Sequence, residues 1–355
     1  MRERSLGGVL LGTRANFAWI TAGRESGIDL SRESGVATVL VAADGRRFLL
    51  ANNIEAHRFL EEELADQDYE PVEVPWTQEQ ADPDWALSRA REVLGPVPMV
   101  TDSAAGKEIA RLRYRLTGPE IERFRELGRD AGTALGEVCR GLRPGLTERE
   151  IGRRASEALM ARGAEAVVLL VAAGDRIARY RHPPPMDNPW TEGGVMIVVC
   201  ARRSGLIAAL TRIVWSGPVP EEIRRRTRAA AEVNARLLAA TRAGVPGREL
   251  FAVAARAYED LGFPGEERLH HQGGPCGYLS RDWIAHPRCE ETVESLQAFA
   301  WNPSVTGTKV EETWIVSDRQ AEGITMTPGW PGLELEVAGR VCTFPGVASL
   351  QEIQT

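Results

Sequence analysis

The sequence lacks the features of membrane, secreted and nucleic-acid-binding proteins. Its apolar stretches, such as residues 195–201, are far too short to cross a bilayer. The first ten residues lack the sustained apolar core of a signal peptide. Basic residues form no stripe that could neutralise phosphates, and the net charge is −7. We therefore expect a cytoplasmic protein with neither nucleic acid nor a membrane as its partner.

Cysteine is scarce. The five cysteines, at positions 139, 200, 276, 289 and 342, are odd in number and widely spaced, which argues against a disulfide framework or a structural zinc site. We expect reduced thiols. Cys200 lies in an apolar strand and is typical of a core residue. Cys276 lies in a glycine-rich turn and is a candidate nucleophile, although no Cys-His-Asn signature accompanies it.

Acidic residues are absent from one long internal stretch. No Asp or Glu occurs between Glu192 and Glu221, although charged residues make up 26% of the chain. Carboxylates are the ligands that hard divalent cations prefer. This stretch therefore contributes no such ligand to any site that it borders.

The chain is long enough for about two domains, since it has 355 residues of which 43% are apolar. The first part predicts a strand at 36–42, a turn at Asp44-Gly45, a strand at 47–50 and an acidic helix from Ile54. A looser stretch rich in Pro, Asp and Trp follows at 71–85. Thr117 with Glu120 then forms a capping box that predicts the start of a new helix and a second domain.

The second domain contains an internal repeat. Glu120-Ile121, a helical segment and the turn at 143–151 recur as Glu222-Ile223, a helical segment and the turn at 242–250. An offset of about a hundred residues indicates two similar halves, each with two helices followed by apolar strands. The sequence predicts an α/β (α+β) fold in which the two halves face each other across a cleft.

Four segments in the same order resemble the creatinase, prolidase and aminopeptidase P superfamily, whose catalytic domain has the duplicated pita-bread fold. The segments are RYRHPPP at 179–185, VMIVVCARRSGLIAALTR at 195–212, HHQGGPCGY at 270–278 and AWNPSVTGTKVEET at 300–313. The resemblance covers nearly the whole chain. It implies a small creatinase-like N-terminal domain at 1–115 and a pita-bread domain at 116–355.

The resemblance also implies where metal ligands would lie. Metallopeptidases of this group hold two divalent cations with two Asp, one His and two Glu. Only one of the matching positions keeps its ligand, as the full set reads Val198, Ala209, Gly274, Asn302 and Glu311. We therefore expect no metal and no other cofactor.

Polar residues nevertheless cluster in the segments that match the site. Three of the five histidines lie there. The full set is His182, His270, His271, Gln272, Arg281, Asp282, Glu311 and Glu312. Polar groups are costly to bury without partners, so the set favours a working site that binds a ligand. A degenerate site that is merely packed is the alternative, and both interpretations remain open.

Creatinase, a metal-free member of the superfamily, suggests roles for these residues. By motif position, His182 matches its acid/base histidine, and imidazole is suited to shuttling a proton at neutral pH. Arg281 matches its carboxylate-binding arginine. Arg32 lies near the position from which creatinase reaches the partner subunit's site, which implies an acidic substrate and a homodimer. His182 as a turn residue before three prolines, and Arg281 paired with Asp282 or Asp318, remain alternatives.

Departures from creatinase limit the analogy. Thr211 replaces one of its guanidinium-binding glutamates, so creatine is not the expected substrate. Glu311 remains as an acceptor, while Glu312 points to the opposite face if the segment is a strand. His270 matches a histidine next to the metal ligands in the family, and His271 is either structural or a new member of the site. The predicted catalytic residues are His182, His270 and Glu311, and the predicted substrate-binding residues are Arg281, Arg32, His271, Gln272, Tyr278, Asn302 and Thr211.

Three functions are compatible with this sequence. The leading hypothesis is a metal-independent hydrolase or lyase that acts on a C–N bond of a small, acidic, carboxylate-bearing substrate. One alternative is a non-catalytic pseudo-peptidase that binds a peptide or protein. The other is a metallopeptidase of the Xaa-Pro aminopeptidase or dipeptidase type, which the missing ligands disfavour.

Overall fold

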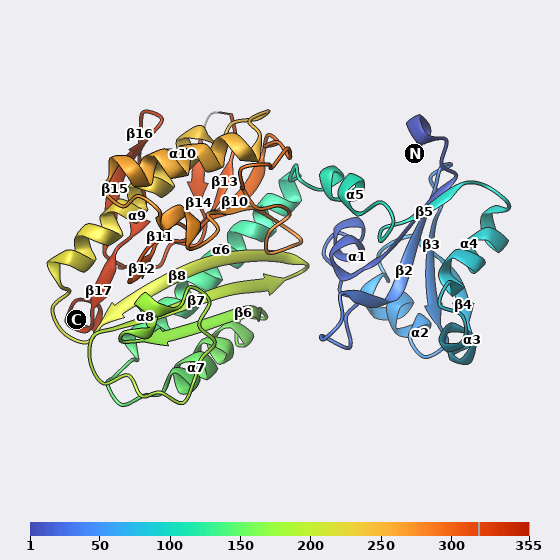
Figure 1. Cartoon of the computed structure of the whole chain (residues 1–355). Helices are drawn as coiled ribbons and strands as arrows, with labels where there is room; N and C mark the ends of the chain where they lie inside the picture. The colour runs from blue at the N-terminus through green and yellow to red at the C-terminus, as the bar shows by residue number, and fades with distance from the viewer. Residues whose placement is uncertain (319, 355) are drawn as a thin grey trace. The chain divides into compact units, whose positions relative to one another are not determined.

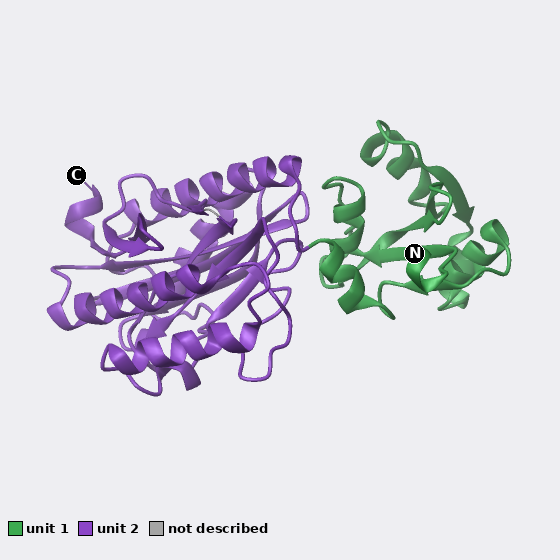
Figure 2. Cartoon of the chain, turned by 90° about the horizontal axis from the view of Figure 1, so that it is seen from above, with its two compact units in different colours: residues 1–113 green, residues 114–355 purple. Residues whose placement is uncertain are grey.

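The computed structural model describes residues 1–318 and 320–354 (Figure 1). The chain divides into two compact units, Met1–Arg113 and Tyr114–Thr355 (Figure 2). Among the described residues, no helix is long and apolar enough to cross a membrane.

The first unit is built on a five-stranded sheet of order β4-β3-β2-β1-β5. The strands are β1 Gly8–Thr13, β2 Ser34–Ala42, β3 Arg47–Asn52, β4 Glu70–Val74 and β5 Met99–Thr101. The helices are η1 Arg2–Arg4, α1 Arg14–Ile20, α2 Ala56–Arg58, η2 Phe59–Glu63, α3 Trp76–Ala81, α4 Trp85–Leu94 and α5 Gly106–Leu112.

Both faces of this sheet are buried because side chains alternate along each strand. On β1, Leu11 packs in the core that contains Phe17 of α1. The neighbouring Leu10 packs in the core that contains Ala90 of α4. The expected acidic helix from Ile54 is confined to α2 and the single wide turn η2. The stretch expected to be loose contains most of β4 and all of α3.

The second unit contains the predicted capping box at the start of α6, in which the Thr117 backbone N–H donates to Glu120 at 2.7 Å. Its helices are α6 Gly118–Arg140, α7 Glu148–Met160, α8 Arg176–Arg179, α9 Glu221–Ala240, α10 Gly247–Asp260, η3 Glu266–Arg268 and α11 Leu350–Gln354. Its strands are β6 Glu165–Ala173, β7 Gly194–Arg203, β8 Leu206–Trp215, β9 Gly273–Cys276, β10 Gln297–Trp301, β11 Ser304–Val305, β12 Thr308–Lys309, β13 Glu312–Val316, β14 Ala321–Gly323, β15 Gly332–Val337, β16 Arg340–Pro345 and β17 Val347–Ser349.

The predicted duplication is present in this unit. Each half contains a helix pair, α6–α7 or α9–α10, followed by the strands of a four-stranded sheet, β17-β8-β7-β6 or β14-β13-β10-β9, and β17 joins the first sheet from the C-terminal end of the chain (Figure 1). An isolated bridge marks the start of the second helix in both halves, Thr147 with Pro189 and Pro246 with Thr292. The sheets meet where β8 borders β13, and the Thr211 N–H donates to the Glu311 carbonyl at 3.2 Å.

Candidate active site

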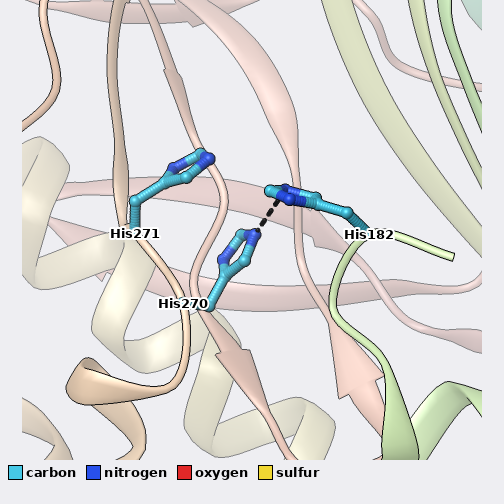
Figure 3. A group of neighbouring side chains, drawn as sticks. All are labelled: His182, His270 and His271. Atoms are coloured by element: carbon cyan, nitrogen blue, oxygen red, sulfur yellow. Dashed lines mark hydrogen bonds between the residues drawn. The ribbon is translucent and has the colours of Figure 1, made fainter.

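Three histidines converge in the second unit. His182 follows α8, whereas His270 and His271 lie between η3 and β9. The Nε2 atoms of His182 and His270 are 3.1 Å apart. One ring nitrogen from each of the three residues lies within 4.8 Å of the others, and Figure 3 shows the rings pointing toward one another. The fold therefore assembles one imidazole cluster from two distant segments, and it includes His271.

The cluster is electrically neutral at neutral pH. Burial, the charge of Lys309 and the other two imidazoles hold the pKa of His270 far below its usual value. Burial, followed by the charges of Arg281, His182 and Lys309, lowers the pKa of His271 to about 4. Burial and Lys309 also lower the pKa of His182. His182 alone among the three is exposed, so it is the imidazole that solvent and a substrate can reach.

Hydrogen bonds fix part of the cluster's proton arrangement. The backbone N–H of Gly273 donates to Nδ1 of His271 at 3.2 Å. In the neutral ring the proton then lies on Nε2, so His271 presents a donor to the cluster. Nδ1 of His270 is buried and has no partner within the described part of the chain. The pair His182–His270 thus shares one hydrogen bond between two neutral rings.

A buried carboxylate holds the loop that carries His182. Glu148, fully buried in α7, accepts from the N–H of Ala173 at 2.8 Å and from the N–H of Met186 at 2.9 Å. It also forms an ion pair with Arg176, whose guanidinium donates to the Pro184 carbonyl at 3.2 Å. Glu148 therefore clamps both ends of the 173–186 loop.

A second anchor fixes the same loop beside His182. Arg181 donates to Glu266 at 2.7 Å and to the hydroxyl of Thr306 at 2.9 Å. Our sequence interpretation missed this anchor and the clamp formed by Glu148 and Arg176. Nothing in the local sequence signals them, because their partners lie in other elements.

A buried carboxylate, Glu311, forms an ion pair with Arg281. Glu311, 1% exposed, accepts from Arg281 Nη2 at 2.9 Å and from the Thr211 hydroxyl at 2.6 Å. Burial acts to raise the pKa of the Glu311 carboxyl, but Lys309 and Arg281 outweigh it and the pKa is lowered. Arg281 therefore pairs with Glu311, and the structure links two residues for which the sequence suggested separate roles.

Lys309 is a site residue that our sequence interpretation missed. It is one of only two lysines in the chain and is 5% exposed. Its ammonium makes no ion pair or side-chain hydrogen bond with any residue in the described ranges. Burial lowers its pKa, and Glu311 opposes that shift. The spacing of Lys309 and Glu311 in an extended stretch places both on one side, which is the signal that could have found it.

Two predicted substrate-binding residues make hydrogen bonds within the protein. Gln272 is fully buried, accepts from the Tyr258 hydroxyl at 2.8 Å and donates to the His270 carbonyl at 2.7 Å. The Tyr278 hydroxyl donates to Glu120 at 2.7 Å and accepts from Arg123 at 3.1 Å. Their role in binding substrate stays a prediction.

Three further candidates differ in exposure and in their partners. The side-chain amide oxygen of Asn302 is buried and has no partner among the described residues. Glu312 points away from Glu311 and pairs with buried Arg212 at 2.6 Å. Arg32 lies in an exposed loop of the first unit, 3.1 Å from Asp29.

The two cysteines of this region are unreactive at neutral pH. Burial raises the pKa of Cys200 to about 12 and that of Cys276 to about 12. The thiolate is the nucleophilic form. Cys276 is therefore corrected from a candidate nucleophile to a buried thiol.

This fold, with its duplicated halves and its site where the two sheets meet, is the pita-bread fold. The chain belongs to metallopeptidase family M24, which matches residues 122–337. It is 23% identical over 225 residues to the Xaa-Pro dipeptidase of Pyrococcus furiosus, a match that covers 61% of this chain and 64% of that protein. The chain thus matches less than two thirds of that relative's length.

Solved structures share the fold of the whole chain. The prolidase of Pyrococcus horikoshii has a TM-score of 0.74 at 18% identity and covers 92% of this chain and 96% of its own. The Xaa-Pro dipeptidase of Bacillus anthracis has a TM-score of 0.71 at 19% identity, with 92% and 95% covered. The N-terminal domain of the chickpea FACT complex subunit SPT16 has a TM-score of 0.66 at 10% identity, with 91% of each chain covered. These likenesses establish the fold alone.

The family name implies divalent metals, but the ligand positions do not fit a dinuclear centre. Val198 and Ala209 share a sheet face with Thr211, as their register in β7 and β8 requires, and neither can coordinate a cation. A side chain at position 274 would place its Cβ 2.1 Å from the Trp283 carbonyl oxygen. Both oxygens of Glu311 already accept hydrogen bonds.

The three histidines are a poor substitute for that centre. A metal-bound imidazole usually donates a hydrogen bond from its other nitrogen. His271 instead accepts one at Nδ1, which leaves the proton on the nitrogen that faces the cluster. The positive charges of Lys309 and Arg181 also act on His270. The donor set and its charge therefore suit a neutral proton-transfer cluster better than a cation.

Proposed function

We propose that the protein is a peptidase-type hydrolase that cleaves a C–N bond in a small substrate with a free carboxylate, and that it uses His182 in place of a dinuclear metal centre. The observation that carries this proposal is the contact of exposed His182 with buried His270 at 3.1 Å. Membership of family M24 supports peptide-bond chemistry rather than a non-catalytic binder. The name Xaa-Pro dipeptidase of a relative suggests dipeptides as substrates.

His182 performs both proton transfers in this mechanism. A water molecule attacks the carbonyl carbon while neutral His182 accepts one of its protons. The resulting imidazolium returns that proton to the leaving nitrogen as the C–N bond breaks. The products are a carboxylic acid and an amine, so atoms and charge balance. His270 keeps the His182 ring in place through the shared hydrogen bond, and the donor of His271 faces the same point.

The test is hydrolysis of a panel of Xaa-Pro dipeptides and N-acyl amino acids by metal-free protein. Purified protein is treated with a strong chelator, and its metal content is measured by mass spectrometry. We expect at least one compound to be cleaved in chelator by the wild type and not by His182→Ala. Cleavage by the His182→Ala protein at the wild-type rate would contradict the proposal.

A metal-dependent Xaa-Pro dipeptidase is the second candidate, and the family and its named relatives favour it directly. It predicts the opposite result in the same experiment. Activity would be lost in chelator and would return on addition of manganese or cobalt. It would also fall when Glu311, the remaining ligand position, is changed to Gln.

The active form in our proposal is a cytoplasmic homodimer in which Arg32 of one protomer serves the other protomer's site. Arg32 is exposed and its side chain pairs with the nearby, exposed Asp29, a pair that costs little to break, so Arg32 can change partners. Light scattering tests the oligomeric state. An Arg32→Ala protein that stays dimeric should bind an acidic substrate more weakly, and unchanged binding would remove Arg32 from the site.

A further inference from the structure

The buried charges of the site do not balance. Lys309 and Arg281 carry two positive charges, and Glu311 carries the one negative charge that pairs with Arg281. Arg181, the other cation that acts on Lys309, is neutralised by Glu266 at 2.7 Å. The three histidines add no charge while they are neutral. When Lys309 is protonated, one positive charge therefore remains without a counter-ion of its own, and the cost of burying it lowers the pKa of Lys309.

Hydrogen-bonding groups in the same region are also unsatisfied. Nε of Arg281 is buried without a partner among the described residues, although the other nitrogens of this guanidinium donate to Ser280 and Glu311. Buried donors without acceptors are rare in folded proteins. Lys309, which is 5% exposed, forms no ion pair within the described ranges. The unpaired donor of Arg281 and the charge of Lys309 are both satisfied by an acceptor with a negative charge.

We infer that Lys309, supported by Arg281, is the receptor for the anionic group of the ligand, and that this group is a carboxylate. This inference rests on the proposed function and identifies the residue that receives the substrate's carboxylate. Arg281 is already tied to Glu311, so Lys309 is the cation that remains available. The Lys309 ammonium would attract the anionic group of the ligand, as metal ions do in the metallopeptidases of the family.

The charge of the site favours a carboxylate over a phosphate. One uncompensated positive charge is balanced by a monoanion. A phosphate monoester carries about −1.5 to −2 at pH 7 and would leave negative charge buried beside Glu311. A neutral amide would leave the Lys309 charge unbalanced. We therefore expect the order carboxylate, then phosphate, then amide in affinity.

The composition of the chain allows a direct test. Lys107, the second lysine, is exposed in α5 of the first unit. Protein labelled with 13C-lysine therefore gives signals from only two lysine side chains, and Lys309→Met identifies which is which. The full chain is titrated with N-acetylglycine, with its neutral amide as the matched control compound and with inorganic phosphate as the competing anion.

We expect N-acetylglycine to shift the Lys309 Cε signal and leave that of Lys107 unchanged. The amide should bind at least about 10-fold more weakly, as should N-acetylglycine to the Lys309→Met protein, because a charged hydrogen bond is lost. Lys309→Arg should keep the preference for the carboxylate, and Lys107→Met should behave as wild type. Equal binding of acid and amide, or unchanged acid binding in Lys309→Met, would overturn the inference. Preferential binding of phosphate would overturn the assignment to a carboxylate.

Folding and catalysis are separated by further readouts. Thermal unfolding of Lys309→Met shows whether the variant is folded, and Lys309→Arg provides a second variant if it is not. Binding by an inactive protein would reject the proposed hydrolase and retain the anion site. Cleavage of neutral amides without any carboxylate preference would reject the anion site and retain only the hydrolase chemistry of the proposed function.

Discussion

His182 and His270 are 88 positions apart in the sequence, yet their Nε2 atoms lie 3.1 Å apart (Figure 3). The first is exposed and the second is 7% exposed. One ring can thus exchange protons with solvent or substrate while the other fixes its position. This asymmetry gives the site a base that solvent and substrate can reach.

The activity should depend on His182 being neutral. Burial and the charge of Lys309 lower the pKa of His182 below the usual 6.5. We therefore expect kcat/KM to be level at neutral pH and to fall only at pH values below 6.5. Lys309→Met removes a positive charge and should move the acidic limb toward higher pH. A pH–rate profile measures both, and an acidic limb above pH 7 in the wild type would contradict the assignment.

The clamp formed by Glu148 should control the order of the His182 loop. Glu148→Ala leaves two backbone N–H groups and Arg176 without their acceptor, so we expect a loss of about 3–5 kcal/mol of unfolding free energy. Surviving protein should show a broadened His182 NMR signal. Asp187→Asn is the control, because its ion pair with Arg149 is exposed and should contribute less than about 1 kcal/mol. Similar effects of the two changes would show that there is no clamp.

Position 274 should not accept a side chain. A Cβ there would lie 2.1 Å from the Trp283 carbonyl oxygen, and backbone cannot move aside easily. We expect Gly274→Ala to cost about 1–3 kcal/mol in unfolding free energy, and Gly274→His to be worse. Gly217→Ala has open space around its Cβ and should change stability by less than about 0.5 kcal/mol. A stable Gly274→His protein that binds manganese would show that the family's metal site can still be restored.

The buried pair of Arg212 and Glu312 should be structural. Arg212→Met leaves the Glu312 carboxylate buried without its cation, so we expect a loss of about 3–5 kcal/mol at pH 8. Burial raises the pKa of Glu312 to about 7, although Arg212 and Thr325 act against the shift. The pKa of Glu312 is higher in the folded protein than its unfolded value of 4.5. Burial of the carboxylate therefore costs stability at high pH, and this cost disappears as the pH falls and Glu312 becomes neutral. The variant should therefore be less impaired at pH 5, and adding Glu312→Gln should restore part of the loss. Denaturant titrations at both pH values measure this.

The elements with local signals could be predicted from the sequence. The capping box at Thr117 and Glu120 starts α6, because its hydrogen bonds join residues three apart. The repeated helix pairs predicted the duplication for the same reason. The stretch at 71–85 was predicted wrongly as loose because β4 pairs with β3, and that pairing depends on a distant segment rather than on the composition of β4.

The sequence by itself carried the family resemblance, and Val198, Ala209 and Gly274 have no side chain that can coordinate a cation whatever the fold. Only the tertiary structure decided how the remaining polar residues are used. Distances between segments far apart in the chain decide that Arg281 is paired, that Lys309 is buried and that the Tyr278 hydroxyl is bonded to Glu120. The spacing of Lys309 and Glu311 could place both on one side of an extended stretch, but burial and charge act through space, so it could not show that the lysine is buried and has no ion pair of its own.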